Sequence, residues 1–338
     1  MKIKILSILM MTIIPTIYAQ QTDFQFLVSQ AVKAPSGHNT QPWLFKLLPE
    51  AIEIHPNFEK SLPVVDADNR EFFVSLGCAA ENLCIAATQK GYETTVSVSE
   101  KGIITIFLAK KEVTPNPLFD QITLRQTNRS VFSGKIPKKD IDILKNLPSE
   151  AGIKYYFYEN GSAEFDTISK FVFRGNALQM QSEAFKNELK SWMRYNKKHQ
   201  DQTRDGLSYA VFGAPNVPRF IAKPIMSLAI NEKTQNKSDR KKIASSSYLV
   251  LFTSEGNTLQ EWVSLGRVLQ RFLLKTTELG IAHAYLNQPN EERQLAHEMA
   301  VELNLKGEFP TILLRIGYGK RQAYSLRKPI EEVIISDK

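Results

Sequence analysis

The sequence predicts an α+β fold built from two related halves within a chain of 338 residues. The motif Val-Ser-Leu-Gly occurs at residues 74–77 and again at 263–266, and a second glycine follows each copy at the same spacing, at Gly91 and Gly280. A four-residue match alone arises by chance, but the shared motif and the shared spacing together indicate an internal duplication. The length is also that of about two domains of roughly 150 residues each.

Each copy of the motif lies in a stretch whose apolar residues recur at helical spacing, and a glycine is expected just past the end of each helix. Strand-like stretches follow at 94–98 and 103–109 after the first copy, and at 311–316 after the second. With 43% hydrophobic and 23% charged residues, the composition is that of a globular protein with enough apolar residues for a sizeable core. Each half is therefore predicted to be a unit of helices and strands.

The first nineteen residues are typical of a secretory signal peptide. Lys2 and Lys4 precede an apolar run over residues 5–17, and the small residue Ala19 comes just before a polar stretch. The run is shorter than the roughly 20 apolar residues that span a bilayer. A buried N-terminal helix is the alternative interpretation. We expect cleavage after Ala19, a periplasmic or secreted protein, and no stable membrane insertion after cleavage.

Charge, cysteines and histidines exclude several classes of function. The net charge of +8 falls to +6 without the two leader lysines (8 − 2 = 6), and the basic residues do not gather with aromatics in one patch, so no nucleic-acid site is predicted. Cys78 and Cys84 are six residues apart on a predicted helix, about 9 Å along its axis, which is too far for a disulfide. We expect two buried free thiols. The five histidines show no metal-ligand spacing, so no metal site is predicted.

The second half is longer than the first. Pro35 precedes the first Val-Ser-Leu-Gly by 39 residues (74 − 35), whereas the comparable Pro148 precedes the second by 115 (263 − 148). The difference, 76 residues, predicts an insertion at about 159–245, which includes a helical-looking stretch at 163–196 and a polar, turn-rich region at 197–224. Long insertions of this kind often form lids or binding segments. The expected organisation is a signal peptide (1–19), a first half (20–115) and a second half (116–338) whose insertion is a possible lid.

A loop at residues 34–43, Ala-Pro-Ser-Gly-His-Asn-Thr-Gln-Pro-Trp, carries an unusual density of polar side chains between an apolar helix (24–32) and a strand (44–48). Its side chains offer both hydrogen-bond donors and acceptors, and its two prolines stiffen the backbone. Such a loop suits a planar heterocycle with alternating donor and acceptor edges, such as the pyrimidine side of a flavin. A polar turn that caps a helix is the alternative.

This loop, extended to Ala-Pro-Ser-Gly-His-Asn-Thr-Gln-Pro-Trp-Leu-Phe, resembles the flavin-ring loop of the nitroreductase-like superfamily, and more narrowly that of its Acg-type branch, in which two nitroreductase-like halves are fused in one chain. Further motifs that fit the resemblance are Leu62-Pro63, Asp68–Glu71, Trp192–Arg194, Arg204–Leu207, Leu286–Pro289 and Leu314–Gly319. The resemblance implies a nitroreductase-like fold: an internal pseudo-dimer of two antiparallel-sheet halves flanked by helices, with FMN in the cleft between them.

The resemblance also assigns the residues that contact the flavin ring. Ser36, Gly37, Asn39 and Gln41 inherit this role from the loop. His38, in the same loop, is included as a cofactor-binding residue; it is either a general acid or, as we favour, a structural hydrogen-bonding residue.

A second candidate segment, Arg125-Gln-Thr-Asn-Arg129-Ser-Val-Phe132, places two arginines four residues apart, either on one helical face or around a tight turn. Either arrangement lets the guanidinium groups bind a phosphate, with Thr127 adding a hydroxyl donor. An isolated pair at this spacing is more often a solvated or salt-bridged surface feature. The segment is, however, similar to the superfamily's phosphate motif, and the same resemblance places Arg327, shortly before a proline, on that phosphate.

The stretch Leu286–Pro289 follows the second repeat helix, where the superfamily usually presents backbone N–H groups near the flavin N5. Asn287 and Gln288 are therefore assigned to the cofactor site. The flavin-ring loop occurs in the first half alone and the arginine pair in the second half alone, because the comparable positions, 24–30 and 148–152, lack them. We expect one complete FMN site per chain.

The function expected from the resemblance is two-electron FMN chemistry by an exported oxidoreductase, with a small molecule or a protein as electron donor. The alternative is an FMN-binding or FMN-sequestering protein with little or no turnover, because a large lid leaves little room for a nicotinamide and an exported compartment is not expected to supply NAD(P)H. A flavin-free anion-binding or scaffold protein is the third interpretation. Because the halves are fused, we expect a monomeric pseudo-dimer.

Overall fold

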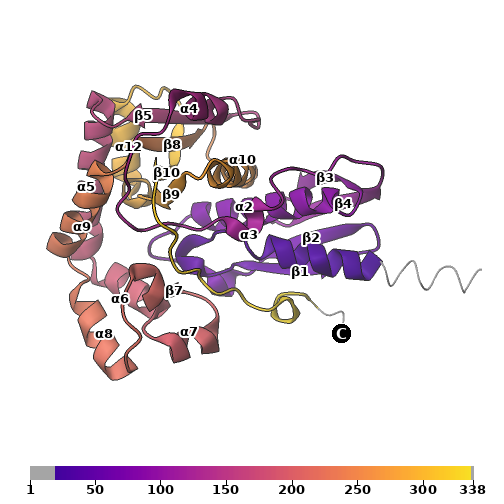
Figure 1. Cartoon of the computed structure of the whole chain (residues 1–338), viewed down its shortest axis with the longest axis horizontal. Helices are drawn as coiled ribbons and strands as arrows, with labels where there is room; N and C mark the ends of the chain where they lie inside the picture. Colours follow the sequence, from indigo (N-terminus) through magenta and orange to yellow (C-terminus); the bar gives the residue numbers. More distant parts are fainter. Residues whose placement is uncertain (1–19, 336–338) are drawn as a thin grey trace, which may run out of the picture.

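The computed structural model describes residues 20–335, and the predicted signal peptide at 1–19 lies outside the described residues. The described chain forms two four-stranded sheets, each antiparallel throughout, together with a short parallel strand pair (Figure 1). Helices pack on both sheets, so the predicted α+β class is confirmed.

The two sheets share one strand order. The first has the order β1-β2-β4-β3 and the second the order β5-β8-β10-β9, so in both the order within the half is first, second, fourth, third. The strands are β1 (Trp43–Leu47), β2 (Ala51–Pro56), β3 (Tyr92–Val98), β4 (Ile104–Lys110), β5 (Ile153–Glu159), β6 (Met193–Arg194), β7 (Leu207–Ser208), β8 (Tyr248–Ser254), β9 (Ala282–Tyr285) and β10 (Phe309–Gly317). The strands predicted at 94–98, 103–109 and 311–316 are therefore confirmed with small shifts at their ends.

A long helix connects the second and third strands of each sheet: α2 in the first half and α10 in the second. Residues 20–31 are also helical. The helices and 3-10 turns that follow are, in chain order, η1 (Gly37–Asn39), η2 (Phe58–Lys60), α2 (Arg70–Thr88), α3 (Gln121–Leu124), α4 (Lys138–Lys145), α5 (Ala163–Gln181), α6 (Glu183–Trp192), α7 (Lys197–Thr203), η3 (Tyr209–Phe212), α8 (Arg219–Leu228), α9 (Glu232–Ala244), α10 (Leu259–Glu278), α11 (Gln288–Glu291), α12 (Arg293–Glu302) and η4 (Ile330–Glu332).

The repeated Val-Ser-Leu-Gly motifs meet where α2 and α10 cross at the centre of the molecule (Figure 1). A Cβ on Gly77 would overlap the carbonyl oxygen of Val263, and a Cβ on Gly266 would overlap that of Val74. These added Cβ atoms would lie 3.0 Å from the Gly266 Cα and 2.9 Å from the Gly77 Cα, respectively. Each glycine thus removes a side chain that would push the helices apart, and the contact is reciprocal.

The predicted insertion lies between β5 and β8 and contains α5 to α9. Its helical-looking stretch is two helices rather than one, because Ser182 leaves the helical backbone and its hydroxyl caps α6 by accepting from the N–H of Phe185 at 3.2 Å. Part of the insertion covers the outer face of the second sheet. Along β8, Leu249 and Leu251 pack with Phe165 and Phe171 of α5, whereas Val250 and Phe252 face the central core. In Figure 1, α6, α7 and α8 extend away from this sheet.

Two extended segments link the halves. The C-terminal tail crosses from the second half to the edge of the first sheet, where the Phe45 N–H donates to the Val333 carbonyl at 2.7 Å (Figure 1). The segment after α3 runs beside β9, with Thr127 bridged to His283. The predicted helical or tight-turn placement of Arg125 and Arg129 is therefore wrong: α3 ends at Leu124, and Arg125 begins an extended segment with φ −63° and ψ 133°.

The helix α2 is apolar because it is the core helix of the first half. It is long and apolar enough to cross a membrane, but 89% of its most apolar window is buried inside the protein. Cys78 and Cys84, both on this helix, are buried free thiols, as the spacing predicted.

Candidate functional site

A cavity of about 1020 Å³ lies where the two halves and the insertion meet. This is at or above the upper end of the roughly 300–1,000 Å³ range of small-molecule sites. The predicted cofactor residues that line it come from four separate segments: Ser36, Gly37, His38, Asn39, Arg125, Thr127, Arg129, Asn287, Gln288 and Arg327. Folding therefore brings together every predicted site residue except Gln41.

The loop over residues 35–41 has a backbone that few side chains adopt readily. His38, Asn39 and Gln41 have φ values of 44°, 57° and 56°, in the left-handed region. Such conformations cost free energy and persist where the surroundings enforce them, often at ligand sites. Here the Ser36 hydroxyl accepts from the Gln41 N–H at 3.0 Å, and the Thr40 N–H donates to the Gly37 carbonyl at 2.9 Å. The loop is thus preformed on the cavity wall.

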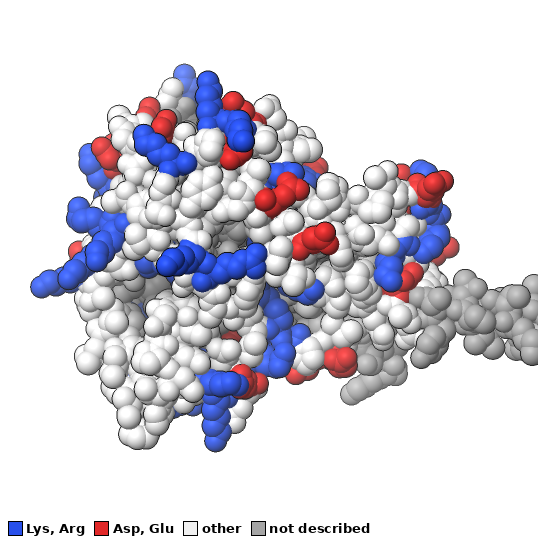
Figure 2. All heavy atoms as spheres, in the orientation of Figure 1, with Lys and Arg blue, Asp and Glu red and all other residues white. Residues whose placement is uncertain are grey.

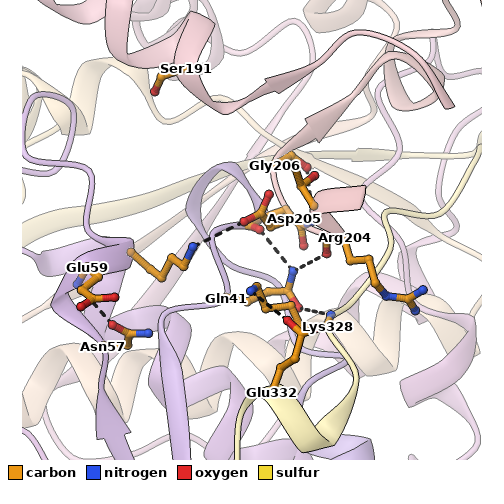
Figure 3. Close-up of polar contacts among 12 residues, drawn as sticks. Gln41, Asn57, Glu59, Ser191, Arg204, Asp205, Gly206, Lys328 and Glu332 are labelled. Atoms are coloured by element: carbon orange, nitrogen blue, oxygen red, sulfur yellow. Dashed lines mark hydrogen bonds and ion pairs between the residues drawn. The ribbon is translucent and has the colours of Figure 1, made fainter. Parts of the chain in front are cut away.

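Gln41 has a different place from the predicted flavin contact. Its amide donates to the carbonyl of Arg204 at 2.8 Å, and its side-chain oxygen accepts from the Lys328 N–H at 2.8 Å (Figure 3). Beside it, the Gly206 N–H donates to the Asn39 carbonyl at 3.1 Å. The Gln41 side chain, which does not line the cavity, joins the loop, the insertion and the C-terminal tail. We call this junction of Gln41, Arg204 and Lys328 the Gln41 clasp.

The insertion side of the clasp is itself held by a buried ion pair. Arg194 and Asp205 lie 2.6 Å apart, with side chains 8% and 7% exposed. Lys60, from the first half, lies 3.6 Å from the same carboxylate. Trp192, whose ring lies 5.5 Å from the Arg194 guanidinium, packs on this pair. Arg194, Asp205 and Trp192 therefore fasten the insertion and do not line the cavity.

Two arginines, the buried Arg125 and the partly buried Arg327, converge on the loop from opposite ends of the second half. The Lys33 carbonyl accepts from Arg125 at 3.0 Å and from Arg327 at 3.5 Å, so the two guanidinium groups are neighbours. Arg327 also donates to the Asn39 side-chain oxygen at 2.7 Å. Burial, with the nearby positive charge of Arg125, lowers the pKa of Arg327 to about 9. Both groups stay positively charged at neutral pH, in a place that disfavours positive charge.

These cations have no acidic partner within residues 20–335. No carboxylate there forms an ion pair with Arg125, Arg129 or Arg327, and the Nε atoms of Arg125 and Arg327 are buried without a hydrogen-bond partner. Burial lowers the pKa of Arg129. Unpaired buried charge is costly, so the group fits a bound anion such as the phosphate of FMN.

His38 is a neutral hydrogen-bonding residue at neutral pH. Burial, with the nearby charge of Arg129, lowers the pKa of His38 to about 4. Its Nδ1 atom is buried without a partner on the cavity wall. The neutral imidazole is suited to hydrogen-bonding a ligand and carries no extra proton to donate as a general acid, which favours the structural interpretation over the catalytic one.

Asn287 and Gln288 lie at the start of α11, and their side chains are largely engaged by the protein. The Asn287 side-chain oxygen accepts from the Leu313 N–H at 2.7 Å, while its amide donates to Glu71. Gln288 donates to Asp239 at 3.3 Å, and its side-chain oxygen is buried without a partner. Gln288 therefore keeps one free acceptor for a ligand, whereas Asn287 positions Glu71.

The sequence assigned no role to a group of three neighbouring acidic residues, Asp66, Glu71 and Glu291, of which the last two line the cavity. Burial, with the nearby Glu291 and Asp66 carboxyls, raises the pKa of Glu71 well above its usual value. Burial raises the pKa of Glu291 to about 7 and that of Asp66 to about 6. Asp66 caps α2 by accepting from two N–H groups, whereas Glu71 and Glu291 line the cavity. The motif Asp68–Glu71 was a usable signal for Glu71.

We predict that the folding stability falls as the pH rises through this group's titration range. The pKa of Glu291 is about 7 in the folded chain and 4.5 when unperturbed. Below the lower value both states hold the proton, and between the two values only the folded state does. The free energy of unfolding therefore falls as the pH rises through this range. The contribution of Glu291 should therefore be lost between these values, by about 2 kcal/mol, less than the full shift because the side chain is partly exposed.

Urea unfolding of the wild type and of Glu291→Gln, at about pH 5 and about pH 8, measures this contribution. The variant should gain stability relative to the wild type at the higher pH. Glu302→Gln changes an exposed acid on α12 and is the matched control. Parallel pH profiles for the wild type and Glu291→Gln would contradict the prediction.

The insertion supplies the apolar side of the cavity. Residues from α5 through to the turn after α8 line it with large apolar side chains. They are Met180, Phe185, Leu189, Met193, Val211, Phe212, Ile225, Met226 and Ile230. The opposite walls come from α2 and the loop of the first half. The cavity therefore has a cationic end near Arg125 and an apolar side provided by the insertion.

Sequence comparison relates the chain to proteins with a named activity. Two Mycobacterium tuberculosis proteins, from strains CDC 1551 / Oshkosh and ATCC 25618 / H37Rv, each named "Putative NAD(P)H nitroreductase", are 23% identical over 321 residues, 91% of this chain and 90% of theirs. No model of a known protein family matches the chain.

Solved structures resemble the chain over about two thirds of its length. An FMN-dependent nitroreductase from Mycobacterium smegmatis, solved with NADPH, is 13% identical and covers 64% of this chain and 96% of its own, with a TM-score of 0.40. An FMN and NADPH-dependent nitroreductase from Sphigopyxis sp. strain HMH is 13% identical and covers 66% of this chain and 100% of its own, with a TM-score of 0.42. The full-length sequence similarity is the stronger of the two relationships.

Proposed function

We propose that this chain, a nitroreductase-like protein, is an FMN-dependent oxidoreductase that holds one FMN in the cavity between its halves. The main support for this proposal is that the loop of the first half and the unpaired arginines of the second half line one cavity. The two relatives, each named "Putative NAD(P)H nitroreductase" and matched over 91% of this chain, support the oxidoreductase class. Because neither half has both parts, one complete site per chain follows.

The proposed cofactor-binding residues form two groups, one for each end of the FMN molecule. Arg125, Arg129 and Arg327 would hold the FMN phosphate, because they are cations on the cavity wall without an acidic partner. Residues 36–39 would contact the ring. FMN supplies two-electron chemistry when bound, and the protein's contribution is to bind it, orient it and exclude water. Glu71, whose pKa is raised well above its usual value, and Glu291, whose pKa is about 7, place exchangeable protons on the cavity wall.

The visible absorbance spectrum of purified residues 20–338, with FMN quantified after heat release, tests the cofactor directly. We expect flavin bands and about one FMN per chain. Colourless protein that also fails to bind added FMN would overturn the proposal. Two FMN per chain would overturn the single shared site and leave the cofactor in place.

Turnover is tested separately from binding. With FMN bound, NAD(P)H should bleach the flavin bands, and a nitroaromatic or quinone acceptor should restore them. A panel that includes NADH, NADPH, dithionite and reduced small proteins distinguishes the donor. If dithionite bleaches the flavin and none of the other donors does, the oxidoreductase assignment is contradicted and the second candidate is favoured.

The second candidate is a protein that holds FMN with little turnover, and the Gln41 clasp favours it. The insertion lines the cavity and is fastened to the loop and to the tail at Gln41 and Asn39. A fastened insertion shields a bound flavin from large donors. This candidate predicts slow reduction by NAD(P)H and slow release of FMN.

Gln41→Ala should loosen the clasp, because it removes the hydrogen bonds to Arg204 and Lys328. If the insertion shields the cofactor, the variant's flavin is reduced by NAD(P)H severalfold faster, and protease cleavage near residues 195–217 becomes faster. Asn57→Ala is the matched control: it removes a nearby side-chain bond to the Glu59 N–H that does not involve the insertion (Figure 3). Equal reduction rates in the wild type and Gln41→Ala would argue against a shield.

We further infer that the halves form an internal pseudo-dimer and that the chain is exported. The shared strand order and the reciprocal contact of Gly77 and Gly266 support the pseudo-dimer. Sedimentation should then show a monomer, and a stable dimer would contradict this assembly. The leader-like sequence at 1–19 supports export. Cell fractionation should recover a chain beginning at Gln20 outside the cytoplasm, and an intact N-terminus in the cytoplasm would refute export.

A further inference from the structure

The helix α8, at the far end of the insertion, leaves an apolar face without a partner in the described chain (Figure 1). Phe220 and Leu228 are 78% and 79% exposed, and Ile221 and Ile225 are 41% and 62% exposed. At helical spacing, these four side chains lie along one side of the helix, with the exposed Pro224 between them. Soluble proteins rarely leave a contiguous apolar face of this kind without a binding role.

The other side of α8 already packs against the protein. Ala222 is buried in a small cluster with Met193 and Tyr195, and Met226 packs against this cluster. The helix is therefore anchored by one apolar side and presents a second apolar side outward. The exposed face is not needed to hold α8 in place.

The helix that bears this face and the helix that follows it, α9, are strongly basic. Over residues 219–241 the exposed cations are Arg219, Lys223, Lys233, Lys237, Arg240 and Lys241, whereas Glu232 is the one exposed acid. Figure 2 shows an uncharged surface at the lower left, where Figure 1 places α8, with basic side chains just above it. An apolar helix face beside a group of lysines and arginines is complementary to an anionic lipid surface, which accepts apolar side chains and attracts cations.

The apolar face continues into the cavity. Ile225 lines the cavity and is 62% exposed, and Phe212, which also lines it, is 47% exposed. The mouth of the cavity on this side is therefore bordered by the same face. A surface that covers α8 also covers this mouth.

We propose that the exposed face of α8 docks the protein on an anionic lipid bilayer, which brings apolar reactants dissolved in the bilayer to the mouth of the cavity. The inserting residues are Phe220, Ile225 and Leu228, and the basic residues of α8 and α9 bind the lipid headgroups. A second copy of the chain is the weaker fit, because two such faces would bring like charges together. Binding of α8 to the bilayer does not depend on the FMN function, whereas delivery of reactants to the cavity rests on it.

Vesicle co-sedimentation of residues 20–338 tests the docking. This chain carries every described element and lacks the apolar run at 5–17, which would bind lipid by itself. Binding should be clear on equimolar phosphatidylglycerol and phosphatidylcholine and weak on phosphatidylcholine alone. Phe220→Ser with Leu228→Ser should lower the partition coefficient at least about tenfold. Lys233→Gln and Lys237→Gln should each lower it about fivefold on the anionic vesicles.

Val301→Ser is the matched control, because Val301 is a comparably exposed apolar residue, 67% exposed, on the distant helix α12. It should bind vesicles like the wild type. A wild type that does not bind anionic vesicles, or a Phe220→Ser/Leu228→Ser variant that binds as well as the wild type, overturns the proposal. Self-association that this double variant abolishes, without vesicle binding, would assign the face to a second copy. Flavin content is measured in parallel, so failure of docking is separable from failure of the FMN site.

Discussion

Arg129→Gln is expected to weaken FMN binding by about 10- to 100-fold, because hydrogen bonds to charged groups contribute about 1.5–3 kcal/mol. Arg129 is the cleanest of the three cations to change. Within residues 20–335 its guanidinium has no hydrogen bond or ion pair, and it lies 5.7 Å from the centre of the Phe212 ring. Arg125 and Arg327, by contrast, donate to Lys33 and Asn39, so their loss would also disturb the loop. Without FMN, the Arg129→Gln variant should be at least as stable as the wild type, because the change removes an unpaired charge from the cavity wall.

Titration calorimetry with FMN and with riboflavin separates a phosphate role from general damage. Riboflavin has the same ring system and no phosphate, so its affinity should be the same for the wild type and Arg129→Gln. Arg293→Gln, on the surface of α12 with a side chain 79% exposed, is the charge-matched control and should bind FMN normally. An equal loss of affinity for FMN and riboflavin would show that Arg129 contacts the flavin ring or maintains the protein's own structure, and does not bind the phosphate.

Gly77→Ala is expected to destabilise the protein by about 3 kcal/mol, the upper part of the range for overpacked cores. The added methyl group would overlap the Val263 carbonyl oxygen and lie 3.0 Å from the Gly266 Cα. Backbone cannot move aside as a flexible side chain does, so α2 and α10 must separate along the core that both halves share. Gly266→Ala should cost a similar amount, because its contacts are the mirror of those of Gly77.

Urea unfolding measures both variants, and Ser264→Ala is the control. Ser264 lies in the same motif on α10 and is only partly buried, so its replacement should change the stability by less than about 0.5 kcal/mol. The double variant is expected to cost less than the sum of the single costs, because one separation of the helices accommodates both methyl groups. Stability of Gly77→Ala equal to that of the wild type would show that the helices do not cross as closely as described.

Local patterns were enough for much of the fold. The paired Val-Ser-Leu-Gly motifs predicted two similar helices, now α2 and α10, because helical spacing and a terminal glycine are local signals. The strands at 94–98 and 103–109 were found for the same reason, since their side chains alternate between core and solvent. The position of the insertion was predicted from the unequal distances between comparable motifs, and α5 to α9 lie within the predicted bounds. The grouping of the cofactor residues rested on a family resemblance, which the cavity lining supports for all of them except Gln41.

Other features depend on contacts between distant parts of the chain. The sequence of the loop predicts Gln41 to be a ligand-binding residue. In the structure its side chain instead forms hydrogen bonds with Arg204 and Lys328, more than 160 residues away. The arginine segment could not be assigned as extended from its spacing, because the edge of β9 holds it through Thr127 and His283. Burial raises the pKa of Glu71 and of Glu291, and the Glu291 carboxyl, 220 residues along the chain, raises the pKa of Glu71 further. A short-range sequence pattern determines which residues lie on one face of a helix or strand. Strand pairing, burial and the charges around a residue depend on residues distant in the sequence that only the tertiary structure places beside it.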